Sequence, residues 1–311
     1  MKTTLSLAAV FAAIILNVAP CAAQQAVSPQ TLYETGINYY EGKNVTRDYK
    51  LAHDNFMMAA KQGHADAWHM LGLMYEYGRG VKQDVATATA CFREGAKGGN
   101  PISQFNYAVA LLEGKGVTRM AAEARKWLEK SASQGYKPAQ YNLGLIYYKG
   151  DGTARDVNKA YPLILEAATG EGGLPDAMYT LASMWLYGAG CQKDLPGALQ
   201  LLEITASHNY WKALYTLGAG YYDGADFVGG KKDMELSFKY LGQFYLKHKD
   251  GRYSQEWQMA MGDALRKLQA FYRFGIGVKE DTELANKLLQ LAGQYGDADS
   301  EQVLRVLGLK K

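Results

Sequence analysis

Few side chains in this sequence have the spacing that metal binding or catalysis requires. His64 and His69 are five residues apart, which is a poor pairing on one face of a helix, and no HExxH motif is present. A zinc site needs several ligands held close together. We therefore predict neither a metal nor a cofactor, and we expect structural or surface roles for all the histidines, which are His53, His64, His69, His208 and His248.

The glycines and serines form no recognised catalytic motif. Several Gly-x-Gly pairs occur, but none continues as GxGxxG, the fingerprint of a dinucleotide-binding loop. No serine begins an SxxK motif or lies in a GxSxG motif. The Gly-x-Gly pairs recur at regular intervals, which indicates turns. The sequence therefore predicts a protein that is not an enzyme.

The overall charge argues against nucleic acid as a partner. Lysine and arginine total 34 and aspartate and glutamate total 31, which leaves a net charge of +3. A protein that grips the nucleic acid backbone normally carries a strong basic excess. Hydrophobic residues make up 48% of the chain, enough to build a buried core.

The first 23 residues have the composition of an export signal. Lys2 supplies a positive charge, and Leu5 to Leu16 form an uncharged, mostly apolar stretch. That stretch is shorter than the ~20 residues that span a bilayer, and it fits the apolar core of a signal peptide. We predict cleavage between Ala23 and Gln24 and a periplasmic or secreted bacterial protein. A membrane anchor helix and lipid attachment at Cys21 are the alternatives.

A repeat of about 36 residues recurs from residue 31 to residue 296, and each copy is aligned here on one central residue. A seventh repeat centres on Gln269, after a longer gap of 51 residues. Three residues after the central residue comes an aromatic side chain in most repeats, then a Gly-x-Gly pair, then an aspartate. In the first six repeats the central residue is small and recurs with gaps of 36, 36, 36, 38 and 36, at Gly36, Gly72, Ala108, Gly144, Ala182 and Gly218.

Each of these features has a role in a pair of antiparallel helices. The aspartate is placed to cap the second helix, because its carboxylate accepts N–H groups that lack partners there. The glycines allow the positive φ of a tight connection, and the small residue lets the second helix approach closely. One pair cannot bury its apolar face alone, so neighbouring pairs bury it jointly. The sequence predicts an all-α, right-handed α-solenoid of about seven helix-turn-helix repeats.

The same frame places the remaining cysteines far apart. Cys91 lies in the second helix of one repeat, and Cys191 follows a Gly-x-Gly turn three repeats later. Neighbouring helices pack ~8–10 Å apart, whereas a disulfide needs Cα atoms within ~7 Å. We predict no disulfide. Neither cysteine has a flanking cluster of cations, so we also expect unreactive thiols.

The pattern resembles the Sel1-like repeat, a relative of the tetratricopeptide repeat. The resemblance is clearest in the fourth repeat, from Ala139-Gln140 through Gly150-Asp151-Gly152 to Ala160, and it covers residues 31–296. It implies an adaptor that binds other proteins, often in a bacterial envelope or at host contact. Cysteine-rich members of the family have been linked to penicillin binding and β-lactamase activity, but this chain lacks their repeated cysteine pairs.

Three regions flank or interrupt the repeats. Residues 24–30 lead into the first repeat, and residues 297–311 are expected to form a polar C-terminal capping helix. An insertion at about 244–261 precedes the seventh repeat and contains Lys247, Lys249 and Trp257. Insertions in repeat proteins map to loops on one face, often the binding face. The alternative is a lengthened helix pair, because the segment has few turn residues.

One face of the first helices carries aromatic residues at helical spacing. If these helices line the concave side of the solenoid, the face is a binding groove for a peptide or a partner helix, since tyrosine and arginine are favoured at interfaces. The two arginines at its end have the chemistry to receive a carboxylate. Packing between repeats is the alternative for the same residues, which are Tyr33, Tyr40, His69, Phe105, Tyr141, Tyr148, Tyr179, Tyr215, Tyr222, Arg266 and Arg273.

Three functions remain open on the sequence. The first is an exported adaptor that binds a protein or peptide through this face. The second is a cell-wall protein that binds or hydrolyses peptidoglycan or β-lactams. The third is a secreted factor that contacts a host.

Overall fold

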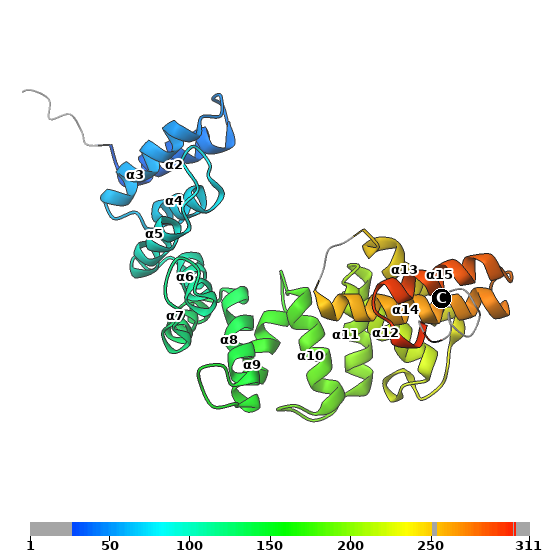
Figure 1. Cartoon of the computed structure of the whole chain (residues 1–311). Helices are drawn as coiled ribbons and strands as arrows, with labels where there is room; N and C mark the ends of the chain where they lie inside the picture. Colours follow the sequence, from blue (N-terminus) through cyan, green and yellow to red (C-terminus); the bar gives the residue numbers. More distant parts are fainter. Residues whose placement is uncertain (1–26, 251–253, 301, 303–311) are drawn as a thin grey trace, which may run out of the picture. The chain divides into compact units, whose positions relative to one another are not determined.

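The computed structural model describes residues 27–250, 254–300 and 302. Within these residues the chain forms fourteen α-helices and one 3₁₀-helix and contains no strand (Figure 1). The predicted all-α repeat fold is confirmed. The export signal at residues 1–23, its cleavage site and Cys21 lie outside the described residues. Of the expected capping helix at 297–311, residues 298–300 and 302 are helical, and the remainder is not described.

The chain divides into two compact units. The first ends at Ser131 and the second begins at Ala132. The N-terminal unit contains α2 (Pro29–Glu41), α3 (Tyr49–Lys61), α4 (Ala65–Tyr77), α5 (Val85–Lys97), α6 (Pro101–Glu113) and most of α7 (Ala121–Ser133). The C-terminal unit contains α8 (Lys137–Lys149), α9 (Val157–Ala168), α10 (Pro175–Tyr187), α11 (Leu195–Ser207), α12 (Trp211–Asp223), η1 (Asp226–Val228), α13 (Met234–His248), α14 (Gln255–Phe274) and α15 (Thr282–Gln294).

The repeated aspartate begins the second helix of six repeats. In each case its carboxylate accepts a hydrogen bond from a backbone N–H in the first turn, and its own N–H donates to a carbonyl near the end of the first helix. One residue therefore starts the second helix and ties it to the first. The third repeat has Met120 instead, which keeps the bond to the Leu111 carbonyl without a side-chain cap. The six aspartates are Asp48, Asp84, Asp156, Asp194, Asp233 and Asp281.

The central glycine of several first helices is required by a buried side chain of the second helix. A Cβ added at Gly36 would lie 2.5 Å from the Phe56 ring, and one at Gly144 would lie 2.7 Å from Ile164. Gly72 meets Phe92 in the same way. The filling side chain comes eight residues after the capping position and is buried in all seven repeats, as Phe56, Phe92, Leu128, Ile164, Leu202, Leu241 and Leu289.

The last two repeats depart from this regular packing. The helix α13 has 15 residues and α14 has 20, whereas every other described α-helix has 12 or 13. The residues of the insertion that are described therefore extend the two helices on either side of residues 251–253. None of the described helices has the length and apolar character needed to cross a bilayer.

Candidate functional site

All eleven predicted binding residues lie on the first helices of the repeats and are partly buried. The predicted face therefore exists, but its side chains are used partly for packing. In the N-terminal unit the Tyr33 ring stacks on His64 at 4.5 Å, and the Tyr40 ring packs edge-on against Tyr49 at 5.4 Å. The rings of His69 and Phe92 lie 5.9 Å apart. Phe105 is also half-buried, on α6.

Tyrosine hydroxyls link successive first helices in the C-terminal unit. The Tyr141 and Thr180 hydroxyls are 3.1 Å apart, and those of Tyr179 and Thr216 are 3.3 Å apart. Tyr215 donates to the Asp263 carboxylate over 3.0 Å. These bonds join α8 to α10, α10 to α12, and α12 to α14, so each tyrosine holds two repeats in register while the rest of its ring stays partly exposed.

The other predicted residues of the C-terminal unit contact the chain itself. The Arg155 guanidinium lies 5.7 Å from the centre of the Tyr148 ring, and the Lys267 ammonium lies 5.3 Å from the centre of the Tyr222 ring. Arg273 donates to the side-chain oxygens of Gln269 and Asn286. These side chains therefore make contacts within the repeats.

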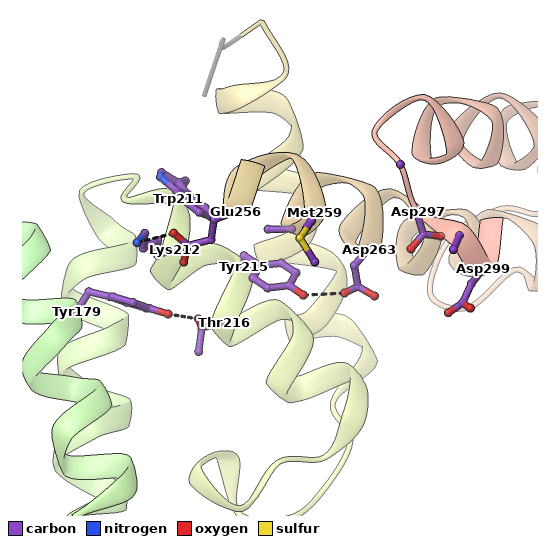
Figure 2. Close-up of a pocket in the computed structure, with 13 residues that line it drawn as sticks. Tyr179, Trp211, Lys212, Tyr215, Thr216, Glu256, Met259, Asp263, Asp297 and Asp299 are labelled. Atoms are coloured by element: carbon purple, nitrogen blue, oxygen red, sulfur yellow. Dashed lines mark hydrogen bonds and ion pairs between the residues drawn. The ribbon is translucent and has the colours of Figure 1, made fainter. Parts of the chain in front are cut away.

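Tyr179 and Tyr215 line a cavity of about 580 Å³, hereafter the acidic groove. Figure 2 shows that its walls come from α10, α12, α14 and the segment that follows α15. Trp211 of α12 and Met259 of α14 add apolar surface. Four carboxylates line the same space, those of Glu256, Asp263, Asp297 and Asp299. The groove therefore places aromatic rings beside acidic groups.

Asp263 is the centre of the charged network. Its two carboxylate oxygens accept hydrogen bonds from Lys267 over 3.0 and 2.9 Å, and Arg266 also donates to it. Lys267 is only 7% exposed, and Asp223 lies 3.7 Å from its ammonium group. A cation that is this well buried needs its carboxylate partners, so Asp263 has a structural role in addition to its place in the groove.

Arg266 is surrounded by carboxylates of its own chain. In addition to Asp263 it lies 3.5 Å from Asp297 and 3.9 Å from Asp299. Burial alone would lower the pKa of Arg266, but these three carboxylates together raise it. The sequence suggested that this arginine receives a carboxylate from a partner. The structure pairs it within the chain, because Asp263 lies one turn before it on α14 and Asp297 and Asp299 approach from the segment after α15.

The balance of charge in the groove is negative. Lys212 is the one cation among the described lining residues, and its ammonium lies 3.0 Å from the Glu256 carboxylate. The same ammonium lies 5.8 Å from the centre of the Tyr179 ring and 5.4 Å from that of Trp211. Counting Arg266 and Lys267, which pair with Asp263, four carboxylates face three cations.

Tyr215 in the groove is held neutral, and so is Tyr210 next to the groove. Burial is the main reason that the pKa of Tyr215 is raised far above its usual value, and the Asp263 charge adds to it. Burial and the hydrogen bond to Asp176 act in the same direction on the pKa of Tyr210, which packs against Tyr179. Neutral phenols offer ring faces to a ligand and bring no further negative charge.

Neither a reactive cysteine nor a metal centre was found among the residues that the structure describes. Cys91 and Cys191 are free thiols. Burial raises the pKa of Cys91 to about 11 and also raises that of Cys191, so both stay protonated and unreactive near neutral pH. Within the described ranges, no group of three histidine, cysteine or acidic side chains has the geometry to hold a metal ion.

Sequence reasoning missed most of the acidic groove. Asp263 lies six residues before Gln269, at a position that has no fixed residue type among the repeats, and Asp297 and Asp299 follow the last helix pair. The insertion was the available signal, because it is the place where the repeat pattern breaks. Trp211 carries no repeat signature, and only its position in the fold reveals it.

Comparison with known proteins identifies the repeats. The Sel1 repeat family model matches seven segments, at residues 29–64, 65–100, 101–136, 137–170, 175–210, 211–245 and 258–297. No curated protein shows a significant match in sequence.

Two solved structures share the fold over most of the chain. One is a protective antigen present in uropathogenic Escherichia coli strains that displays an SLR fold. It is 27% identical, with a TM-score of 0.75, and the match covers 91% of this chain and 58% of the other. This chain thus spans less than two thirds of that protein. The other is a Sel1 repeat protein from Oxalobacter formigenes. It is 28% identical, with a TM-score of 0.62, and the match covers 76% of this chain and 94% of the other.

Proposed function

The chain belongs to the Sel1 repeat family, and we propose that it is an exported, non-catalytic adaptor that holds a basic segment of a partner protein in the acidic groove. Sel1 repeat proteins typically mediate protein–protein interactions, and their scaffold is typically non-enzymatic. The observation that carries the proposal is the meeting of Tyr179, Trp211 and Tyr215 with the carboxylates of Asp297 and Asp299 in one cavity.

Aromatic rings and carboxylates together recognise a lysine or arginine side chain. A ring face attracts a cation by ~0.5–2 kcal/mol, and a carboxylate adds a charge-assisted hydrogen bond. The chain supplies its own example, since the Lys212 ammonium lies between two ring faces and Glu256. A partner's cation entering beside it would meet Asp299, whose side chain is 75% exposed.

Export is supported by the sequence of residues 1–23, with its basic start and short apolar core. That segment favours a periplasmic or secreted location. We place the adaptor in a bacterial envelope on the same ground, with its partner among envelope or secreted proteins.

A binding measurement with matched variants tests the proposed groove. The mature chain from Gln24 is titrated with a labelled peptide of alternating arginine and alanine and with its glutamate counterpart. The Asp297→Asn, Asp299→Asn double variant should weaken binding of the arginine peptide about tenfold, which corresponds to ~1.4 kcal/mol. Asp226→Asn with Glu235→Gln removes the same net charge outside the groove lining and should leave binding unchanged.

The outcomes separate the candidate functions. Equal loss in both double variants would mean that only overall charge matters, and the groove proposal would fail. Retention of the wild-type chain on purified peptidoglycan, with no peptide binding, would favour the cell-wall function.

The host-contact function has one specific observation in its favour, which is the description of the E. coli relative as a protective antigen. Antibody labelling of intact producing cells, compared with permeabilised cells, tests it. Labelling of intact cells, or recovery of the protein from the culture medium, supports this function. Labelling only after permeabilisation, with none of the protein in the medium, excludes it.

A further inference from the structure

A second cavity opens between α13, α14 and α15, and it shares no lining residue with the acidic groove. Its volume is about 550 Å³. The three helices lie together at the C-terminal end of the chain (Figure 1). Leu246 of α13 is 66% exposed at its edge, while Leu268 and Tyr272 of α14 and Leu284 of α15 form apolar walls. We call this cavity the apolar groove.

Gly242 makes the apolar groove deep on the α13 side. It lies nine residues after the capping position of its repeat, where each of the other repeats has a large side chain. A Cβ built on Gly242 would have no heavy atom within 4 Å, in contrast to Gly36 or Gly218. Glycine in a helix interior costs ~1 kcal/mol relative to alanine. The residues at the equivalent position are Met57, Arg93, Glu129, Leu165, Glu203 and Gln290.

The rim of the apolar groove carries positive charge only. Lys239 and Lys247 line it, and no carboxylate does. Both lysines are exposed, and neither forms an ion pair with any residue that the structure describes. They are eight residues apart on α13, which places them ~12 Å apart along the helix axis. The complementary occupant is apolar in its middle and anionic at its edges.

We propose that the apolar groove binds an amphipathic helix of a partner protein, with an apolar stripe flanked by carboxylates. The walls favour a helix because each presents residues four apart, such as Gly242 and Leu246 on α13 and Leu268 and Tyr272 on α14. Rows at this spacing are the ridges and grooves by which helices pack, and a glycine at the crossing point lets the two backbones approach. This site goes beyond the proposed function, because its position, charge and ligand all differ from those of the acidic groove.

Filling the groove gives a test in which the variant still folds. Gly242→Leu adds a side chain into open space and replaces a poor helix former by a good one, so thermal stability should be kept or raised. The probe is a labelled, designed helix with one leucine stripe flanked by glutamates, titrated into the full mature chain. Gly242→Leu should weaken its binding by about tenfold or more. Unchanged binding in a folded Gly242→Leu variant would overturn the proposal.

Charge reversal tests the rim independently. Lys239→Glu with Lys247→Glu should reduce binding of the glutamate helix by about tenfold and improve binding of a counterpart helix with lysines in place of the glutamates. Lys82→Glu with Lys231→Glu makes the same change in net charge away from the groove lining, and should leave both affinities unchanged. Equal effects of the two double variants would overturn the proposal.

The competing occupant is an anionic lipid, with oleate as the probe. Saturable oleate binding that Gly242→Leu abolishes, with no binding of the helix, would assign the groove to lipid and overturn the proposal. The Asp297→Asn, Asp299→Asn variant should bind the glutamate helix as the wild type does. The proposal for the acidic groove and the proposal for the apolar groove can therefore be rejected independently of each other.

Discussion

Mid-helix glycines of the regular repeats and Gly242 near the end of the C-terminal unit have opposite surroundings. In the N-terminal unit, Gly36 and Gly72 are covered by the rings of Phe56 and Phe92, which the second helix of the same repeat inserts against them. At the end of the C-terminal unit, Gly242 faces a cavity that the chain leaves open. In a regular repeat the second helix covers the glycine of the first helix. Where the repeat pattern breaks, the glycine stays uncovered and leaves a surface for another molecule.

Ion pairs follow the same division. In the N-terminal unit, Lys115 reaches Glu76 over 2.8 Å, with both side chains in contact with solvent. In the C-terminal unit, Asp263 holds the buried Lys267 and also Arg266 beneath the acidic groove. The Lys115–Glu76 pair of the regular region therefore lies at the surface, whereas the Lys267–Asp263 pair lies in the interior, where the repeat is broken.

Removal of the buried Phe56 ring should have the largest effect on stability. Phe56→Ala takes away a ring with no exposed surface that packs against Tyr33 and Gly36, so we expect a loss of ~3–5 kcal/mol in the free energy of unfolding. Leu246→Ala at the open groove should change it by less than ~0.5 kcal/mol. Urea denaturation followed by circular dichroism measures both. Similar losses would show that the apolar groove is closed in solution.

Removal of the charge at Asp263 should be the next largest effect. Asp263→Asn leaves the Lys267 ammonium buried with only Asp223 near it, and we expect a loss of ~3 kcal/mol. Glu76→Gln in the N-terminal unit breaks an ion pair that water can replace, which should cost less than ~1 kcal/mol. The same denaturation experiment compares them. Equal costs would contradict the structural role of Asp263.

Alanine at two glycines should move stability in opposite directions. Gly72→Ala pushes a methyl group into the Phe92 ring and should destabilise by ~1–3 kcal/mol. Gly242→Ala meets no neighbour and should stabilise by ~0.5–1 kcal/mol through helix propensity. Thermal melts of the two variants give the sign directly. A destabilising Gly242→Ala would mean that the groove is filled in the free protein.

The sequence revealed the repeat because its rules are local. The caps at Asp48 and Asp281 and the close approach at Gly36 depend on residues within one helix pair, so spacing alone predicted them. The acidic groove depends on residues from three repeats and a terminal turn. Asp263 meets Tyr215 across the contact between α12 and α14, and sequence spacing does not give the distance between these two side chains.

The aromatic face of the first helices was predicted from the sequence only in part. Its position on the first helices was predictable from periodicity, but its use was not. Tyr179 both bonds Thr216 and lines a cavity, while Tyr148 contacts only the chain itself. The identity of the next repeat's side chain decides between these uses, and a pattern of aromatic residues does not contain that information.

The smallest expected effect concerns His69, a partly buried histidine of the N-terminal unit. Burial lowers the pKa of His69 despite the nearby Asp66 and Glu76, so the folded chain binds a proton there less readily than the unfolded chain. As the pH falls below ~6.5, the usual value of the unfolded side chain, the unfolded state gains a proton that the folded state does not. The free energy of unfolding should therefore decrease as the pH decreases, by no more than ~1.4 kcal/mol per pH unit from this group. His69→Gln should flatten this part of the pH dependence, as urea denaturation at pH values on either side of that point will measure. An unchanged slope would mean that water reaches His69. The N-terminal unit would then be less tightly packed than the contacts of Gly36 and Gly72 indicate.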